Sequence, residues 1–180
     1  MSQRNTLVRS MHDIGLAAWF GGSLMGAVGL NGAASKAEPA SQKLKISSIG
    51  WGRWAPVQLA AIAVHGIGSV GLIIGNKGRI AADSGTQVNT AVKFVLTGVA
   101  CGATLYSAVL GGVIAKHSDE DAEGVTEPGA RTSKELAAAQ TKQRFAQWVL
   151  PAVTAALIVL AAQQGEQQRP VAGWLNRVFS

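Results

Sequence analysis

Four long apolar stretches, separated from one another by polar segments, dominate the pattern along the chain. Each stretch approaches the ~20 residues that an α-helix needs to cross ~30 Å of hydrocarbon. The pattern therefore predicts an all-α fold, an integral membrane four-helix bundle. Its helices are expected to cross the bilayer at about residues 14–34, 54–75, 90–115 and 145–162.

The polar segments predict the remaining elements. Residues 118–131 are rich in acids and contain a Pro-Gly pair, which is typical of a solvated loop. Thr132 followed by Glu135 fits a capping box, so the last long helix should begin well before its span. Residues 164–180 carry apolar positions at helical spacing. We expect them to form an amphipathic helix on the membrane surface, after a bundle domain of residues 1–163.

The first span resembles a secretory signal peptide at its start, because Arg4 and Arg9 precede an apolar run. The run is longer than a usual signal-peptide core, so we expect the span to be retained, although cleavage stays open. The flanking Lys and Arg are too evenly divided between the two sides to fix the orientation.

Composition narrows the class of partner. Of the 180 residues 48% are hydrophobic and 14% are charged, and the charges are concentrated outside the four stretches, with Asp13, Lys93 and the titratable His65 as the exceptions. The net charge of +6 comes from Lys and Arg beside the spans, with no basic block interleaved with aromatic residues. This favours contact with membrane lipids over binding to nucleic acid.

Glycines recur at four-residue spacing on the first three apolar stretches. Small residues at this spacing let two helices approach closely in lipid. Three such faces are more than a minimal bundle needs, which favours a homo-oligomer or a larger membrane protein complex. The pairs are Gly22 with Gly26, Gly71 with Gly75, and Gly98 with Gly102.

His65 is the ionisable residue closest to the middle of a span, where such a group is costly and therefore a functional candidate. Antiparallel alignment of the spans predicts a polar layer around it that could bind a small molecule or relay protons. A structural histidine that joins helices by hydrogen bonds is the alternative, and the sequence favours it. The other members of the predicted layer are Ser23, Cys101, Thr104, Tyr106 and Thr154.

Other chemistry-bearing residues point to structure rather than catalysis. Asp13 and Lys93 enter from the same side and are expected to form an ion pair. The three histidines are expected at three different depths, which argues against a haem held by two of them. The G-x-G-x-x-G spacing of residues 66–71 lies inside a span and lacks the strand that a nucleotide site requires. We expect no enzymatic activity, metal or cofactor.

The run Met11–Gly22, together with Trp51, Trp54, Val57 and His65-Gly66, resembles small four-span membrane proteins of actinobacteria that have no assigned function. The start of the first helix is also similar, more distantly, to other small bacterial helical membrane families. The resemblance covers the first three spans. It implies a membrane bundle and carries no activity or catalytic residue.

The sequence therefore favours a non-catalytic, multi-pass protein of the bacterial cell membrane that serves as an accessory or scaffolding subunit. The alternative is a small-molecule or proton-handling protein centred on His65. A haem or quinone redox protein is a third, weaker hypothesis.

Overall fold

The structure is a computed structural model that describes residues 5–166, and within that range it is helical with no strand. The first helix runs as α1 (Thr6–Met25), a π-helical turn η1 (Gly26–Leu30) and α2 (Asn31–Ala34). It is followed by α3 (Ser41–Gly75), the short α4 (Lys77–Ala82), α5 (Ser84–Lys116) and α6 (Lys134–Glu166). Most of the amphipathic helix predicted for residues 164–180 lies outside the described residues.

Four of these helical segments are long and apolar enough to cross a membrane, as the hydrophobic pattern predicts. They are longer than the predicted spans because the helices continue past the apolar residues. The 35 residues of α3 rise about 52 Å, well beyond ~30 Å of hydrocarbon. The segment before Trp54, predicted as one of the polar connections, is therefore mostly helix, and Pro56 lies inside α3.

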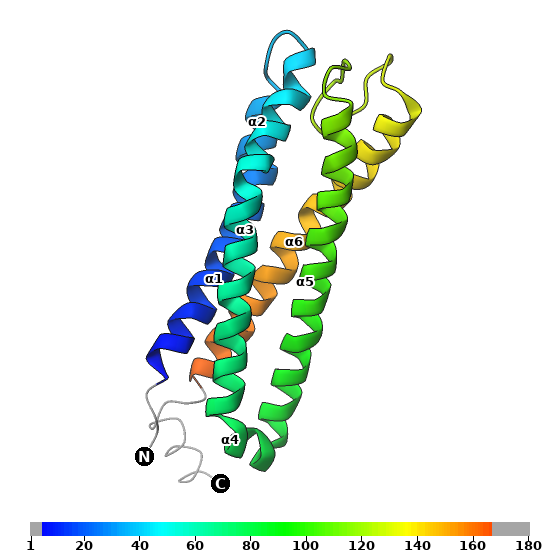
Figure 1. Cartoon of the computed structure of the whole chain (residues 1–180). Coiled ribbons are helices and arrows are strands. Elements are labelled where there is room, and N and C mark those ends of the chain that lie inside the picture. The colour runs from blue at the N-terminus through cyan, green and yellow to red at the C-terminus, as the bar shows by residue number, and fades with distance from the viewer. Residues whose placement is uncertain (1–4, 167–180) are drawn as a thin grey trace.

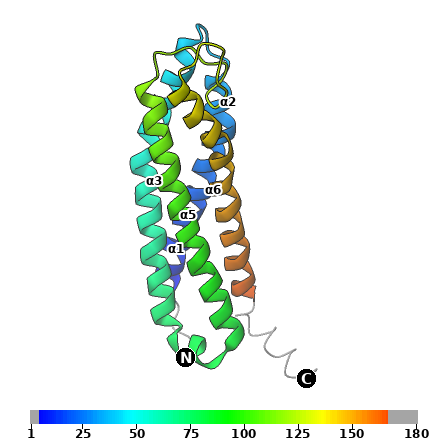
Figure 2. The ribbon, with the colours of Figure 1, turned by 90° about the vertical axis from the view of Figure 1, so that its right-hand side faces the viewer.

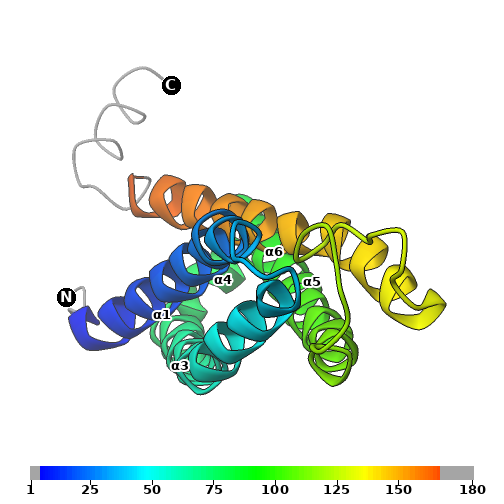
Figure 3. The ribbon, with the colours of Figure 1, turned by 90° about the horizontal axis from the view of Figure 1, so that it is seen from above.

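The helices pack as two antiparallel hairpins. In one, α1 packs along α3, and in the other α5 packs along α6 (Figure 1). Contact between α1 and α6 joins the hairpins, whereas α3 and α5 touch only sparsely (Figure 3). The connections at residues 35–40 and 117–133 lie at one end of the long axis and α4 lies at the other (Figure 2).

Glycines set the distance between α1 and α3. A Cβ added to Gly15 would lie 2.5 Å from the carbonyl oxygen of Ala61 and 2.5 Å from the backbone nitrogen of His65. Gly68 meets the backbone of α1 at His12 in the same way. The two backbones therefore touch at these positions, where any larger residue would force the helices apart.

Gly15 and Gly68 were not among the predicted packing glycines, which divide into two groups. On the first hairpin, Gly22 and Gly26 face the rings of Trp54 and Trp51, which fill the space that a side chain would need. Gly71 packs on Val8 and Gly75 on Asn5, so both also face α1 or its start. On α5, nothing lies within 4 Å of a Cβ added to Gly98 or Gly102.

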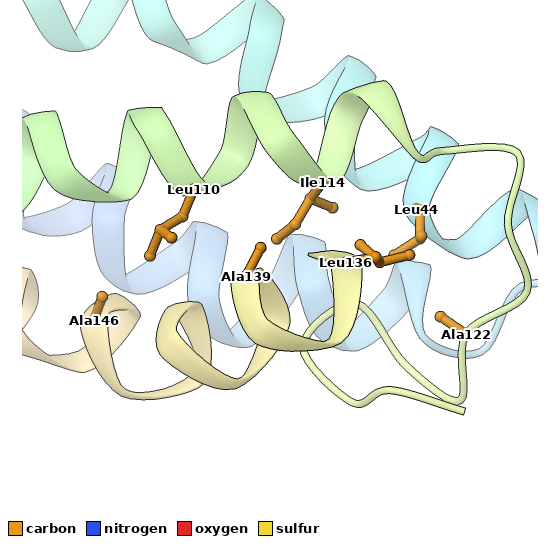
Figure 4. Packing of buried hydrophobic residues seen from close by; sticks show 7 residues of the cluster. All are labelled: Leu44, Leu110, Ile114, Ala122, Leu136, Ala139 and Ala146. Carbon is orange, nitrogen blue, oxygen red and sulfur yellow. The ribbon is translucent and has the colours of Figure 1, made fainter. Parts of the chain in front are cut away.

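Two clusters of buried apolar side chains support this arrangement. One lies near the end of the molecule that carries residues 117–133, where α3, α5, α6 and the loop converge (Figure 4). Its members are Leu44, Leu110, Ile114, Ala122, Leu136, Ala139 and Ala146. The other joins α1, α5 and α6 through Leu16, Trp19, Ala100, Leu150 and Leu157.

The acidic segment is folded against the helices rather than fully solvated, which differs from the prediction. Val125 and Thr126 are buried, and the buried Gln140 side chain donates hydrogen bonds to the carbonyl oxygens of Gly124 (3.0 Å) and Val125 (3.1 Å). Glu120 accepts a hydrogen bond from the Ser133 backbone N–H, which is the main reason why its pKa lies below the ordinary value. The acidic side chains of this segment remain at the surface, while its small residues cover the end of the bundle.

We expect Gly15→Ala to destabilise the fold by about 1–3 kcal/mol, the usual range for overpacking, because its methyl group would collide with the backbone of α3. The matched control is Gly21→Ala on the same helix, where nothing lies within 4 Å of the added atom. Thermal unfolding of both variants in one detergent measures the difference. Equal melting temperatures would show that the helices do not depend on this contact.

Candidate functional site

A cavity of about 220 Å³ lies between α1, α3, α5 and α6, towards the end of the molecule that carries α4. It occupies the side on which α3 and α5 touch only sparsely. Its wall is largely apolar, but ionisable and amide side chains reach it from all four helices. These are Arg9, His12, Asp13, His65, Asn76, Lys93 and Gln164.

Two histidines form the most buried part of this polar set. The ring centroids of His12 and His65 lie 4.5 Å apart with the planes tilted by 48°. Both residues are almost inaccessible, at 3% and 2% exposure, and the Trp19 ring lies 6.1 Å from His65. The prediction that all histidines lie at separate depths is wrong for this pair. Because the two rings are in contact, no macrocycle fits between them, so they do not form a pair of haem ligands.

Hydrogen bonds fix the orientation of both rings. Nδ1 of His65 donates to the carbonyl oxygen of His12 (3.1 Å), because a carbonyl can only accept. Nδ1 of His12 donates to the Asp13 carboxylate (2.7 Å). Ser69 donates to the carbonyl of His65 (2.8 Å), and its oxygen lies 3.5 Å from Nε2 of the same ring. Each imidazole is thus held through Nδ1, which leaves Nε2 for another partner.

The two predicted members of an ion pair line the cavity separately. Nζ of Lys93 donates to Oε1 of Gln164 (2.8 Å), whereas Asp13 bonds to His12. Among the ion pairs that involve described residues, a direct contact between Asp13 and Lys93 does not occur. The structure therefore brings both charges to one cavity without joining them.

The other predicted partners of His65 lie elsewhere. Ser23, Thr104 and Thr154 return their hydroxyls to carbonyl oxygens of their own helices, and Thr104 also accepts from Nε1 of Trp19 (3.2 Å). Cys101 and Tyr106 are exposed on α5. None of these residues lines the cavity, so the predicted polar layer does not form around His65.

For Ser23, the reason is the register between the first two long helices. The antiparallel alignment of the spans predicts Ser23 at the level of His65, but the glycine contact places Gly15 at that level. This difference of eight residues corresponds to about 12 Å along a helix. It moves the polar start of α1 alongside the apolar half of α3 and brings His12 to His65. Apolar length alone carries no information about such an offset.

A second polar cluster, missed by the sequence analysis, lies near the π-helical turn. Oδ1 of Asn31 accepts from the Ser47 hydroxyl (2.9 Å) and from Nε1 of Trp51 (2.9 Å). Its Nδ2 donates to Oε1 of Gln147 (3.0 Å), which ties the first helix to α3 and α6. The sequence does contain a feature that indicates this cluster. Asn31 is an amide within an apolar stretch, where polar groups join helices. Both acceptor positions of the Asn31 oxygen and one of its two N–H donors are used by neighbouring helices, which indicates a structural role for the cluster.

Comparison with family models, with curated proteins and with solved structures gave no match. The cavity is therefore interpreted from its own geometry. Among the described residues, no group of three or more His, Cys, Asp or Glu side chains is placed to hold a metal ion. The arrangement instead offers hydrogen-bond donors and a cation beside an apolar wall.

We expect Asn31→Leu to lower the free energy of unfolding by about 1–3 kcal/mol, because it leaves buried donors of Ser47 and Trp51 without an acceptor. Gln163→Leu, at an exposed amide of α6, is the control. Urea unfolding in detergent, followed by circular dichroism, measures both. A loss no greater than that of the control would show that the cluster contributes little to the fold.

Proposed function

We propose that this protein is a non-catalytic, multi-pass protein of the bacterial cell membrane that binds a small molecule in the cavity beside His12 and His65. The observation that carries the proposal is the convergence of ionisable and amide side chains from all four long helices on a mostly apolar cavity at the level of the spans. Binding sites for small molecules have this composition, with an apolar lining and a few placed polar groups.

The depth of these groups supports a function. His65 precedes the end of α3 at Gly75 by ten residues, or about 15 Å of helix. Lys93 follows the start of α5 at Ser84 by nine residues, or about 14 Å. Ionisable side chains at such depths in a span are expensive and are usually kept because they serve a ligand or a proton path.

Ligand binding explains the geometry better than a proton relay. A relay needs successive hydrogen bonds between groups that exchange protons. The described contacts join the His12 ring to Asp13, whereas the His65 ring bonds to the backbone carbonyl of His12 and not to its ring. The Nδ1 proton of His65 is held by a carbonyl oxygen. A ligand, by contrast, requires only space and convergent donors, and both are present.

The same proposal says how the two hairpins around the cavity lie in the membrane. In the membrane the two hairpins form a four-helix bundle, with lipid beside the open face between α3 and α5.

We expect Thr97→Phe to abolish ligand retention, because Thr97 lines the cavity and the larger ring would fill it. The matched control is Val99→Phe, two residues further along α5 at an exposed position outside the cavity. Native mass spectrometry of protein extracted gently from its own membranes reads the mass of any retained molecule. The wild type and the control should carry an adduct that Thr97→Phe lacks. The same adduct on all three proteins, or on none, would refute the proposal.

A second candidate function, an accessory or scaffolding subunit, is favoured by the outer face of α5. This span is the least buried of the four. Gly98 and Gly102 form a small-residue ridge that no part of the described chain covers. In lipid such a ridge suits close packing against another helix, either of a second copy or of a larger assembly.

If α5 forms such an interface, Gly98→Leu should reduce the assembled fraction at least tenfold, because the side chain would separate the helix backbones. Gly52→Leu on α3 is the control, since nothing lies within 4 Å of a Cβ there either. Light scattering of detergent-solubilised protein gives the assembled mass. An unchanged mass in the Gly98 variant would remove the scaffolding hypothesis for this face.

A further inference from the structure

We propose that the ligand is an amphiphile with an anionic head group, held by Lys93 and exposed to lipid along its apolar part. This inference rests on the proposed binding function and adds the chemical class of the ligand. It follows from the charge of the cavity, from the position of its opening and from its volume.

The charge of the cavity favours an anion. The ammonium group of Lys93 has a neutral partner, the amide oxygen of Gln164 at 2.8 Å, and an ammonium group has two further N–H donors. Asp13 is the sole carboxylate among the described lining residues, and it is bonded to His12 with 55% of its side chain exposed. No carboxylate among the described lining residues is bonded to Lys93, so its ammonium group can receive an anion.

The opening of the cavity faces the lipid. Val70 and Ile73 of α3 and Phe94 of α5 line the cavity and are also exposed on the surface, by 56%, 42% and 77%. These side chains belong to the two helices that touch only sparsely, so the cavity opens sideways between them. A molecule that enters here comes from the bilayer and must itself be partly apolar.

The volume fits a head group better than a whole ligand. The cavity holds about 220 Å³, less than the roughly 300–1,000 Å³ of pockets that enclose a drug-sized ligand. A charged head and the first part of an alkyl chain can enter, while the remainder lies across Phe94 in lipid. A carboxylate and a phosphate share the required chemistry, so the head could belong to a fatty acid or to an anionic phospholipid.

The test uses the full chain in phosphatidylcholine nanodiscs, with dodecanoate, dodecan-1-ol and phosphatidylglycerol as probes. Native mass spectrometry counts bound probe per protein, and Thr97→Phe gives the background from lipid partitioning. We expect one dodecanoate at least tenfold tighter than dodecan-1-ol, because the ion pair forms in a poorly hydrated site. Lys93→Met should remove this preference and Lys93→Arg should retain it. If Lys93→Met does not give monodisperse protein, Lys93→Gln, which keeps a polar side chain, replaces it.

The outcomes separate this inference from the function on which it rests. Displacement of dodecanoate by phosphatidylglycerol would assign the head to a phospholipid, and its failure would assign it to a free carboxylate. Equal binding of dodecanoate and dodecan-1-ol, blocked by Thr97→Phe, would overturn the anionic class and leave the binding function intact. Dodecanoate binding that survives Lys93→Met and Lys93→Gln would overturn the role of the lysine. No bound probe and no native ligand would overturn both.

Discussion

The backbone contact between α1 and α3 at Gly15 and Gly68 is the constraint on which the other features depend. Interlocking glycines let two helices touch directly, and such a contact fixes their register because neighbouring positions carry side chains that cannot fit. Trp51 and Trp54 reinforce it further along by filling the space over Gly26 and Gly22. Once this register is set, the positions of the polar residues follow.

The register places charged and titratable groups where the membrane disfavours them. The polar start of α1, with Arg9, His12 and Asp13, lies beside the apolar second half of α3 and lines the cavity. Part of the free-energy cost of burying these polar groups is offset, because His12 bonds to Asp13 and His65 bonds to the backbone of α1. Lys93 reaches the same space from α5 and shares a hydrogen bond with an amide.

The two hairpins are joined closely through α1 and α6 but only sparsely through α3 and α5, and this difference determines where a ligand can enter. Buried apolar clusters and the Asn31 hydrogen bonds join the first helix to α3 and α6, whereas α3 and α5 are left with few mutual contacts. The folded acidic segment closes the far end of the molecule by covering Leu44 and Leu136. The cavity therefore lies at the opposite end and opens sideways, and the outer face of α5 remains for lipid or another helix.

The sequence by itself determined the helical class, the four spans and the early start of α6, because hydropathy and helix-start residues are local properties of the chain. The cap of α6 is Ser133, whose hydroxyl accepts from the Leu136 N–H (3.3 Å), and not the predicted Thr132, which bonds to the loop instead. It identified His65, Asp13 and Lys93 as the residues to examine, since ionisable groups in apolar stretches stand out. Only the tertiary structure decided that His12 joins them and that Ser23, Cys101, Thr104, Tyr106 and Thr154 do not. The physical reason is that apolar length leaves two helices free to slide past each other by several residues. Backbone contact at particular glycines is what stops them.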